Sequence, residues 1–428
     1  MQFLYKNIAG VGEAEIQKSR ELLLEYIAEC SQGVQNKNYE MNEASLCLVD
    51  DAEKINTVQK LIEKKKTNLL KYIIVVGIGG SNLGTKAIYD AIYGGFDLLQ
   101  EKRFPKMIFL DTTDPEYLLH FEEFFNKSIS KEGEVIVNII SKSGGTMETA
   151  VNGEIVIKLL KAKFENWKER CVITTDKGSK LWNSAIAQGI DTLEIPKKVG
   201  GRYSVFSPVG LFPLALCGFN IEKILASAQI MRDECLNGIG EQNRALTSAI
   251  ILYKHLKKGI SINDNFYFHN ELESVGKWYR QLMGESIGKE GMGLTPTVSI
   301  GSTDLHSMVQ LYLGGPKNKY TSFIYTNTFD IYNLPANNTL SDIKEIEGEP
   351  VGTIMNAIQQ GTITAYKKQN LPFTEIIFEA ISAEEIASYM QFKMIEMMFL
   401  GKLMKVNSFD QPQVELYKTE TKKILAKK

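Results

Sequence analysis

The sequence predicts an α/β fold of two doubly wound, mainly parallel-sheet sandwich domains with helical N- and C-terminal segments. Short apolar runs alternate with helical patterns along the chain, which is the rhythm of parallel βαβ units. Twice in the first half, an apolar run leads through a polar, glycine-containing loop into a helical pattern. With 428 residues the chain is longer than one ordinary domain, so we expect a first domain at residues 1–196 and a second at 197–428.

In the first domain, helices are expected before the sheet begins. Residues 14–30 and 51–62 carry apolar side chains at helical spacing. Apolar runs then predict strands at 73–76, 107–110, 135–140, 171–174 and 192–195. The helical patterns among them lie at 85–93, 116–125, 149–161 and 181–187.

The second domain repeats this class of structure with longer helices. Strands are expected at 266–269, 297–299, 322–325 and 375–381. Helical patterns fill the gaps at 221–237, 248–257, 274–283, 305–313 and 383–405. The sequence has no low-complexity segment and no short repeat period, which excludes a solenoid.

The charge balance excludes a strongly basic surface. Lys+Arg number 49 and Asp+Glu 51, a formal net charge of -2, so there is no overall basic field to attract nucleic acid or acidic lipid. The five cysteines lie far apart without a Cys-x-x-Cys pair, which is typical of a reducing compartment and argues against a zinc site.

Targeting and membrane signals are also missing from the sequence pattern. Residues 1–12 do not combine a basic start with an apolar core, so we expect no signal peptide. The apolar stretch 205–217 is interrupted by Pro208 and Pro213 and is shorter than the roughly 20 residues of a membrane span. We therefore expect a cytoplasmic protein.

Two loops are suited to binding phosphate. Ser141-Lys142-Ser143-Gly144-Gly145-Thr146 lies between a predicted strand and a predicted helix, so backbone N–H groups and the positive end of a helix dipole point to one place. Gly77-Ile78-Gly79-Gly80-Ser81 follows the first predicted strand in the same way. Because loops at the carboxyl ends of parallel strands meet at a ligand site, the two loops predict a phosphorylated small molecule as ligand.

The glycine loop matches neither of two common nucleotide motifs. A dinucleotide-binding fingerprint would need its third glycine where Asn82 stands. A P-loop would read Gly-Lys-Ser/Thr where the chain has Gly84-Thr85-Lys86. The sequence therefore does not predict a nucleotide cofactor.

Four further clusters place polar groups beside glycines in apolar surroundings. They are residues 199–204, 284–289, 302–306 and 408–418. Together they supply the carboxylate of Glu285, the guanidinium of Arg202, the imidazole of His306 and the ammonium of Lys418, which is an acid–base set with a charge stabiliser. Taken one at a time, each also fits a structural role, such as a surface turn for Arg202 or a helix end for Glu285.

A rival chemistry fits one of these clusters. Gly284-Glu285-Ser286-Ile287-Gly288 matches the Gly-x-Ser-x-Gly elbow of serine hydrolases, which requires a buried strand leading into the serine. Residues 274–281 are polar and helix-like instead, so a nucleophilic role for Ser286 is disfavoured.

Taken in order, these segments resemble the glucose-6-phosphate isomerase (phosphoglucose isomerase) family, which has a two-domain sugar-isomerase fold. The matching elements are Gly77-Ile78-Gly79-Gly80-Ser81, Ser141-Lys142-Ser143-x-x-Thr146, Val199-Gly200-Gly201-Arg202-Tyr203-Ser204, Glu285-Ser286-x-Gly288-Lys289, His306, and Phe409-Asp410-Gln411-x-x-Val414-Glu415-x-x-Lys418. They cover residues 77–418, and their shared order is far more specific than any single element.

The resemblance implies reversible aldose–ketose isomerisation of glucose 6-phosphate to fructose 6-phosphate, a step of glycolysis and gluconeogenesis, without a metal or an organic cofactor. Glu285 would move a proton between carbons 2 and 1, and Arg202 would stabilise the enediolate formed between the two transfers. The residues that would bind the substrate phosphate are Gly80, Ser81, Ser141, Lys142, Ser143 and Thr146.

The resemblance also implies how the sugar ring opens. His306 and Lys418 would shuttle protons between the ring oxygen and the anomeric hydroxyl, while Gln411 positions the substrate. In the family, the matching histidine reaches the site from the other subunit of a dimer, so we expect a homodimer. The chain departs from the family at Gln413, where glycine is usual, and at residues 143–145, where relatives often carry threonine and bulkier residues.

Two alternatives stay open at this stage. One is a dual phosphoglucose/phosphomannose isomerase or a mannose-specific enzyme, because the choice of epimer at carbon 2 depends on contacts that the sequence does not locate. The other is a non-catalytic sugar-phosphate sensor, although such a protein would have little reason to keep Glu285, Arg202, His306 and Lys418 together.

Overall fold

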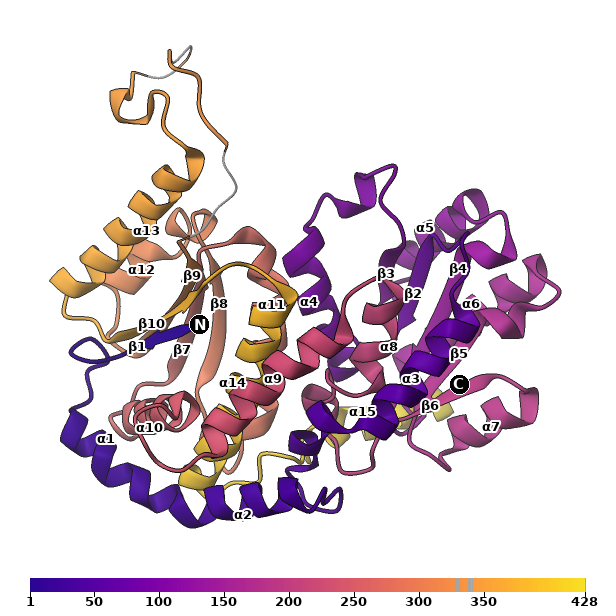
Figure 1. Cartoon of the computed structure of the whole chain (residues 1–428), viewed down its shortest axis with the longest axis horizontal. Helices are drawn as coiled ribbons and strands as arrows, with labels where there is room; N and C mark the ends of the chain where they lie inside the picture. Colours follow the sequence, from indigo (N-terminus) through magenta and orange to yellow (C-terminus); the bar gives the residue numbers. More distant parts are fainter. Residues whose placement is uncertain (328–331, 338–339, 341, 428) are drawn as a thin grey trace.

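Within residues 1–327, 332–337, 340 and 342–427, which the computed structural model describes, the chain forms two five-stranded sheets (Figure 1). Helices lie against both sheets and between them. This arrangement confirms the α/β class with mainly parallel sheets that the sequence predicts.

The first sheet is parallel throughout and has the order β3-β2-β4-β5-β6. Its strands are β2 (Tyr72–Val76), β3 (Lys106–Leu110), β4 (Val135–Ile140), β5 (Cys171–Thr175) and β6 (Asp191–Glu194). All six residues of β4 are buried, as expected for a parallel strand covered on both faces. Because β2 lies between β3 and β4, the loops after β2 and β4 flank the point where the strand order reverses, which is where such sheets bind ligands.

Local sequence signals explain where the helices of this half begin and end. They are α3 (Ala52–Lys65), α4 (Leu83–Tyr93), α5 (Pro115–Ser128), α6 (Met147–Lys163), α7 (Lys180–Gln188) and α8 (Pro208–Leu216). At the start of α5, the Asp114 carboxylate accepts hydrogen bonds from two backbone N–H groups, and Pro115 takes the first helical position. Gly189 ends α7 in the left-handed conformation with φ 71°.

The second sheet has the order β1-β10-β9-β7-β8, with β1 antiparallel to β10 and the other pairs parallel. Its strands are β1 (Gln2–Leu4), β7 (Ile262–Tyr267), β8 (Thr295–Ile300), β9 (Lys319–Thr326) and β10 (Phe373–Phe378). The chain thus opens on a strand that the sequence pattern does not reveal, because three residues are too few to show alternation. The division near residue 196 stays a prediction, since β1 belongs to the sheet of the second half.

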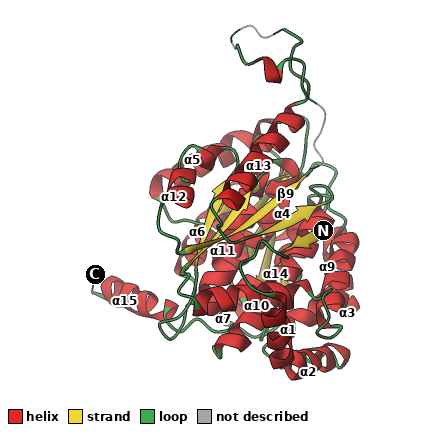
Figure 2. Ribbon diagram, turned by 90° about the vertical axis from the view of Figure 1, so that its left-hand side faces the viewer, coloured by secondary structure: helices red, strands yellow, loops and turns green. Residues whose placement is uncertain are grey.

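The remaining helices are α1 (Glu13–Arg20), α2 (Leu24–Gln35), α9 (Ile221–Leu236), α10 (Arg244–Lys257), α11 (Glu273–Ile287), α12 (Val309–Gly314), α13 (Val351–Lys368), α14 (Ala383–Met404) and α15 (Val414–Ala426). Helix α14 is buried along most of its length and packs against α9, α10 and α11. Helix α15 projects from the body, and none of its residues, all of them described, is buried (Figure 2).

One apolar core joins the two halves of the molecule. It runs from Ile73 and Val75 in the first sheet to Ile324 and Ile376 in the second. Helices α4 and α11 lie against each other where the halves meet. None of the helices in the described part of the chain is long and apolar enough to cross a membrane.

Some predicted elements are shifted or divided. The expected strand at 266–269 is β7, which begins at Ile262 because the polar Asn263, Asp264 and Asn265 are buried within it. The expected helix at 305–313 is a short 3-10 turn, Thr303–Leu305, followed by α12. Helices α8 and α13 are absent from the predicted set.

Candidate active site

Arg202 lies at the centre of a buried cluster that joins three distant segments. It lies in the turn Gly201–Tyr203, which comes after β6, and its side chain is 1% exposed. Its five N–H groups donate to Ser286 Oγ (2.9 Å), Glu285 Oε2 (3.1 Å), Gln411 Oε1 (2.6 Å), Ser408 O (2.6 Å) and Asp410 O (3.0 Å). Every donor of the guanidinium therefore has a partner, and the plane of the group is fixed.

Glu285 lies near the C-terminal end of α11 with its side chain 26% exposed. Its Oε2 accepts from Arg202, and its Oε1 accepts from Gln281 Nε2 at 3.0 Å. The residues 281 and 285 are one helical turn apart, so α11 presents the amide and the carboxylate on one face. The carboxylate is thus oriented by two donors while part of it stays accessible to a ligand.

The glycine loop after β2 contacts the backbone of the arginine turn directly. A Cβ at Gly80 would lie 2.1 Å from the carbonyl carbon of Gly201 and 2.5 Å from the nitrogen of Arg202. Ser204 Oγ also donates to the carbonyl oxygen of Gly80 at 3.2 Å. Only glycine permits this approach, which holds Ser81 and its loop next to Arg202.

The second predicted phosphate loop collects hydroxyl groups at the start of α6. Ser141 Oγ lies 3.4 Å from Thr146 Oγ1, and Gly145 N donates to Ser143 Oγ at 3.2 Å. Gly144 has φ +69°, and a Cβ there would lie 2.8 Å from Leu181 Cβ, so the turn requires glycine. Hydroxyls and the N-terminus of a 17-residue helix together form a site suited to an anion.

Lys142 adds positive charge to this loop. Burial lowers the pKa of the Lys142 ammonium, Asp176 opposes this effect, and Lys198 adds to it. Asp176 N donates to the carbonyl oxygen of Lys142 at 3.1 Å, which places the end of β5 beside the loop. A bound phosphate would favour the charged lysine and offset the cost of its burial.

Lys418 on α15 approaches the same loop from the other side. A hollow of about 50 Å³ is lined by residues 145–148 and, on α15, by Tyr417, Lys418, Thr421 and Lys422. In this arrangement Lys418 Nζ pairs with Glu415 at 2.8 Å. Gln413, where the family usually has glycine, has φ -69° and ψ -25°, a conformation that any residue adopts.

His306 lies apart from the other candidate residues. It is exposed and follows the turn at the end of β8. Because α11 leads from β7 to the parallel strand β8, it runs antiparallel to both, and Glu285 lies near the start of β8. The length of α11 between its two ends is roughly 20 Å at 1.5 Å per residue. Among the described residues, no hydrogen bond or ion pair given by the structure joins His306 to Arg202, Glu285 or Gln411.

Some residues of the cluster were missed by sequence reasoning. Gln281 orients Glu285, and its spacing of four residues from Glu285 on a predicted helix could have indicated this contact. Ser286 lies inside α11, where its hydroxyl accepts from Arg202 and is hydrogen-bonded to the Tyr203 hydroxyl at 2.9 Å. It is therefore a structural partner of Arg202 and does not lie on a strand-to-helix elbow.

Metal ligands do not gather anywhere in the described part of the chain. Its residues contain no group of three or more His, Cys, Asp or Glu side chains that could hold a metal ion. All five cysteines are buried as free thiols.

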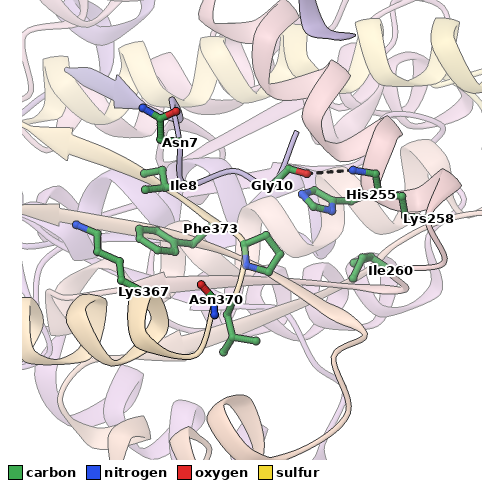
Figure 3. A pocket seen from close by; sticks show the side chains of 11 residues that line it. Asn7, Ile8, Gly10, His255, Lys258, Ile260, Lys367, Asn370 and Phe373 are labelled. Carbon is green, nitrogen blue, oxygen red and sulfur yellow. Dashed lines mark hydrogen bonds between the residues drawn. The ribbon is translucent and has the colours of Figure 1, made fainter. Parts of the chain in front are cut away.

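A separate hollow of about 510 Å³ lies at the end of the second sheet where β10 begins (Figure 3). Two of its basic groups hold the N-terminal segment: His255 Nε2 is 2.7 Å from the carbonyl oxygen of Ala9, and Lys258 Nζ donates to that of Gly10 at 3.0 Å. Lys367 Nζ lies 6.0 Å from the centre of the Phe373 ring. We assign no ligand to this hollow.

Comparisons with known proteins agree with the geometry. The family model described as phosphoglucose isomerase matches residues 49–305. A glucose-6-phosphate isomerase of Methanocaldococcus jannaschii is 35% identical over 370 residues, 86% of this chain and 86% of that protein. One of Leptospira biflexa is 33% identical over 405 residues, 91% of this chain and 86% of that protein.

Solved structures share the fold. A hypothetical protein of Thermus thermophilus has a TM-score of 0.86 at 27% identity, covering 99% of both chains. A glucose-6-phosphate isomerase of Chlamydia trachomatis has a TM-score of 0.76 at 19% identity, covering 96% of this chain and 84% of that one. Because the family model matches residues 49–305 and these relatives are 33–35% identical over 86–91% of the chain, the chain belongs to the phosphoglucose isomerase family.

Proposed function

We propose that this chain interconverts glucose 6-phosphate and fructose 6-phosphate. The observation that carries the proposal is the pair formed by Glu285 and the buried Arg202, 3.1 Å apart, beside two phosphate-suited loops. Such a pair supplies a base and a fixed positive charge at one point, which is what proton transfer next to a carbonyl requires. The family membership and the names of the relatives support the same reaction.

The phosphate is assigned to the loops after β2 and β4. Ser81, Ser141, Ser143 and Thr146 would donate hydroxyl hydrogen bonds, and Lys142 would supply a positive charge. Gly80 contributes by its lack of a side chain, because the contact with Gly201 sets the distance between the phosphate loop and Arg202. These residues bind a group that does not change during the reaction, so they act mainly on affinity.

Proton transfer is assigned to Glu285. In the open-chain sugar, the carboxylate takes the proton from carbon 2 of the aldose, and the electron pair of that C–H bond forms the enediolate. The proton then returns to carbon 1, and the hydroxyl proton passes from oxygen 2 to oxygen 1, which gives the ketose. A positioned acid–base group contributes about 10²–10⁴-fold, and one donor to the developing oxyanion about 10²–10³-fold. Arg202 is the donor, and Gln411 positions the sugar beside it.

Ring opening is assigned to His306 and Lys418. Lys418, on α15, lies beside the loop after β4. His306 lies at the end of β8 that is far from Glu285. This separation supports a homodimer in which His306 of one copy serves the site of the other. The described residues between β9 and α13 project from the body, and Tyr332, Leu340 and Ile343 among them are exposed, which would suit such an interface (Figure 1).

The composition and the reaction class further support a cytoplasmic enzyme of sugar-phosphate metabolism. The near-zero net charge gives no reason to expect a nucleic-acid partner. The named relatives are glucose-6-phosphate isomerases, so a mannose-specific enzyme or a non-catalytic sensor is not favoured.

The test is formation of glucose 6-phosphate from fructose 6-phosphate by the purified protein, followed with a coupled dehydrogenase. A chelator is present throughout, and mannose 6-phosphate is assayed in parallel. We expect metal-independent turnover by the wild type. Binding of fructose 6-phosphate without turnover would refute the proposal and favour a sensor, and equal turnover of mannose 6-phosphate would widen the specificity.

A further inference from the structure

Lys289 joins two parts of the site, the end of α11 and the loop after α14, that Arg202 also contacts. Its ammonium donates to the carbonyl oxygens of Glu285 (2.9 Å), Ser286 (2.9 Å) and Asn407, and it pairs with Asp410 at 3.3 Å. The first two carbonyls belong to the last turn of α11, where helical carbonyls lack helical partners. The other two contacts lie on the loop 407–411, which follows α14. Lys289 thus ties the end of α11 to this loop.

The loop 407–411 holds Arg202. The carbonyl oxygens of Ser408 and Asp410 accept from its Nη2, and Gln411 Oε1 accepts from its Nη1. The helix α11, in turn, carries Glu285. Lys289 therefore bridges the element that presents the base and the loop that orients the charge stabiliser.

Burying the charged ammonium of Lys289 costs free energy, which indicates that the charged group is needed there. The Lys289 side chain is 9% exposed, and burial, followed by the charge of Arg202, lowers the pKa of Lys289, while Asp410 raises it. An apolar side chain of similar length would fill the space without that cost. It could not bridge carbonyl oxygens from two segments, since a lysine ammonium offers three donors and an apolar chain offers none.

We propose that Lys289 is a positioning residue for the isomerisation, which sets the distance between Glu285 and Arg202 by locking the loop 407–411 to the end of α11. The proposal rests on the proposed function. Lys289 is expected to act through these two residues without touching the sugar.

The test compares steady-state kinetics of Lys289→Met, Lys289→Arg and the wild type with fructose 6-phosphate as substrate. We expect Lys289→Met to lower kcat about 10- to 100-fold, the range expected when reacting groups are displaced by up to about 1 Å. KM should change by less than about threefold, because the phosphate loops are not touched. Lys289→Arg, which keeps a cation that can reach both segments, should recover part of kcat.

Lys65→Met is the matched control. Lys65 is fully buried, donates to the carbonyl oxygen of Glu169 at 2.9 Å and pairs with Asp191 at 2.6 Å. Asp191 begins β6, so this contact lies at the opposite end of the first sheet from the phosphate loops. We expect Lys65→Met to lower the temperature of unfolding and leave kcat unchanged, which separates a loss of packing from a loss of positioning.

Asp410→Asn keeps the test decisive if Lys289→Met fails to fold. Asp410 is 51% exposed, so the substitution does not disturb the core, and we expect kcat to fall about two- to fivefold at constant KM. Beside an active wild type, wild-type kcat in Lys289→Met, or in Asp410→Asn where Lys289→Met does not fold, would overturn the role of Lys289 and leave the proposed function standing. Absence of turnover in the wild type itself would overturn the proposed function and this proposal with it.

Discussion

At the scale of single residues, the contact between Arg202 and Glu285 suits a reaction in which negative charge passes from the carboxylate to the substrate. Before reaction the guanidinium donates to the Glu285 carboxylate at 3.1 Å. In the proposed reaction Glu285 would take up a proton and become neutral, while the substrate would become an enediolate with a negative oxygen. The arginine then faces one negative group in either state, and its other four hydrogen bonds keep it in place, so little reorganisation is needed.

Glu285→Gln tests the base directly. The amide keeps an oxygen that can accept from Arg202 or Gln281 but cannot take up the proton, so kcat should fall about 10²–10⁴-fold with KM nearly unchanged. Exchange of the carbon 2 hydrogen of glucose 6-phosphate with solvent deuterium, followed by NMR, should be lost in parallel. Wild-type exchange in this variant would contradict the assignment.

Gly80→Ala tests the contact between the two loops. The new Cβ would lie 2.1 Å from the carbonyl carbon of Gly201. Because the atoms that it meets belong to the backbone, no side chain can rotate away, and the two loops must move apart. We expect a stability loss of about 1–3 kcal/mol and at least a tenfold loss in kcat/KM. Gly95→Ala is the control, because a Cβ there would meet none of the described atoms within 4 Å. Equal effects of both changes in denaturation and kinetics would show that the Gly80 contact is unimportant.

The sequence identified Arg202, Glu285 and Gln411 as candidates through the motifs that contain them, and the structure places these three side chains in contact. It could not identify the contacts that hold them. Gly80 and Gly201 meet across 121 positions of chain, and Lys289 reaches Asn407 across 118. Such pairings depend on how helices and sheets pack, which local patterns do not encode.

At the scale of elements, a buried charge network fixes α11 against its neighbours. Glu396 on α14 accepts from Lys393 at 2.7 Å, from the Tyr279 hydroxyl of α11 at 2.7 Å and from Ser248 of α10. Burial lowers the pKa of Lys393, and its ammonium also lies 4.8 Å from the centre of the Tyr279 ring. Because α11 carries Glu285, this network sets the helix on which the proposed base stands.

Lys393→Met should destabilise the protein strongly. It leaves the Glu396 carboxylate buried without its cation, which costs about 3–5 kcal/mol. Lys277→Met is the control on α11, since Lys277 forms an exposed pair with Glu273 worth at most about 1 kcal/mol. Urea unfolding followed by fluorescence measures both changes. Similar midpoints for the two variants would show that the buried pair contributes little.

Element boundaries were predictable where apolar runs face a core on both sides, as in β4, which matches the expected 135–140. They were not predictable where polar residues are buried. In β7, Asp264 accepts hydrogen bonds from Thr297, Ser299 and Tyr312, partners contributed by β8 and α12, and only these partners make the carboxylate acceptable inside the sheet.

At the scale of the whole molecule, the candidate site lies where the two halves meet. The loop after β2 contacts the turn of Arg202, α4 packs against α11, and α15 brings Lys418 to the loop after β4. The parallel sheets were predictable from the alternation of strands and helices. The position of one half relative to the other was not, nor was the distance between His306 and Glu285, because both follow from packing between segments far apart in sequence.

The position of His306 predicts that two copies of the chain are needed to complete each site. Glu285→Gln and His306→Ala should each lose most activity as pure proteins. If each site takes Glu285 from one copy and His306 from another, a mixed dimer holds one site with both native residues and one with neither. Half of the dimers in an equal, fully exchanged mixture are mixed, so activity should return to roughly a quarter of the wild-type value.

A mixture of Glu285→Gln with Arg202→Ala is the control for this experiment. These two residues contact each other within one chain, so every site in their mixed dimer lacks one of them, and activity should stay low. Recovery in the first mixture but not in the second would place His306 across the subunit boundary. Equal recovery in both, or in neither after subunit exchange has been verified by native mass spectrometry, would mean that His306 does not complete the site of a partner. The comparison thus depends on geometry alone, since each variant carries a single change and the two mixtures differ only in which pair of residues is divided between copies.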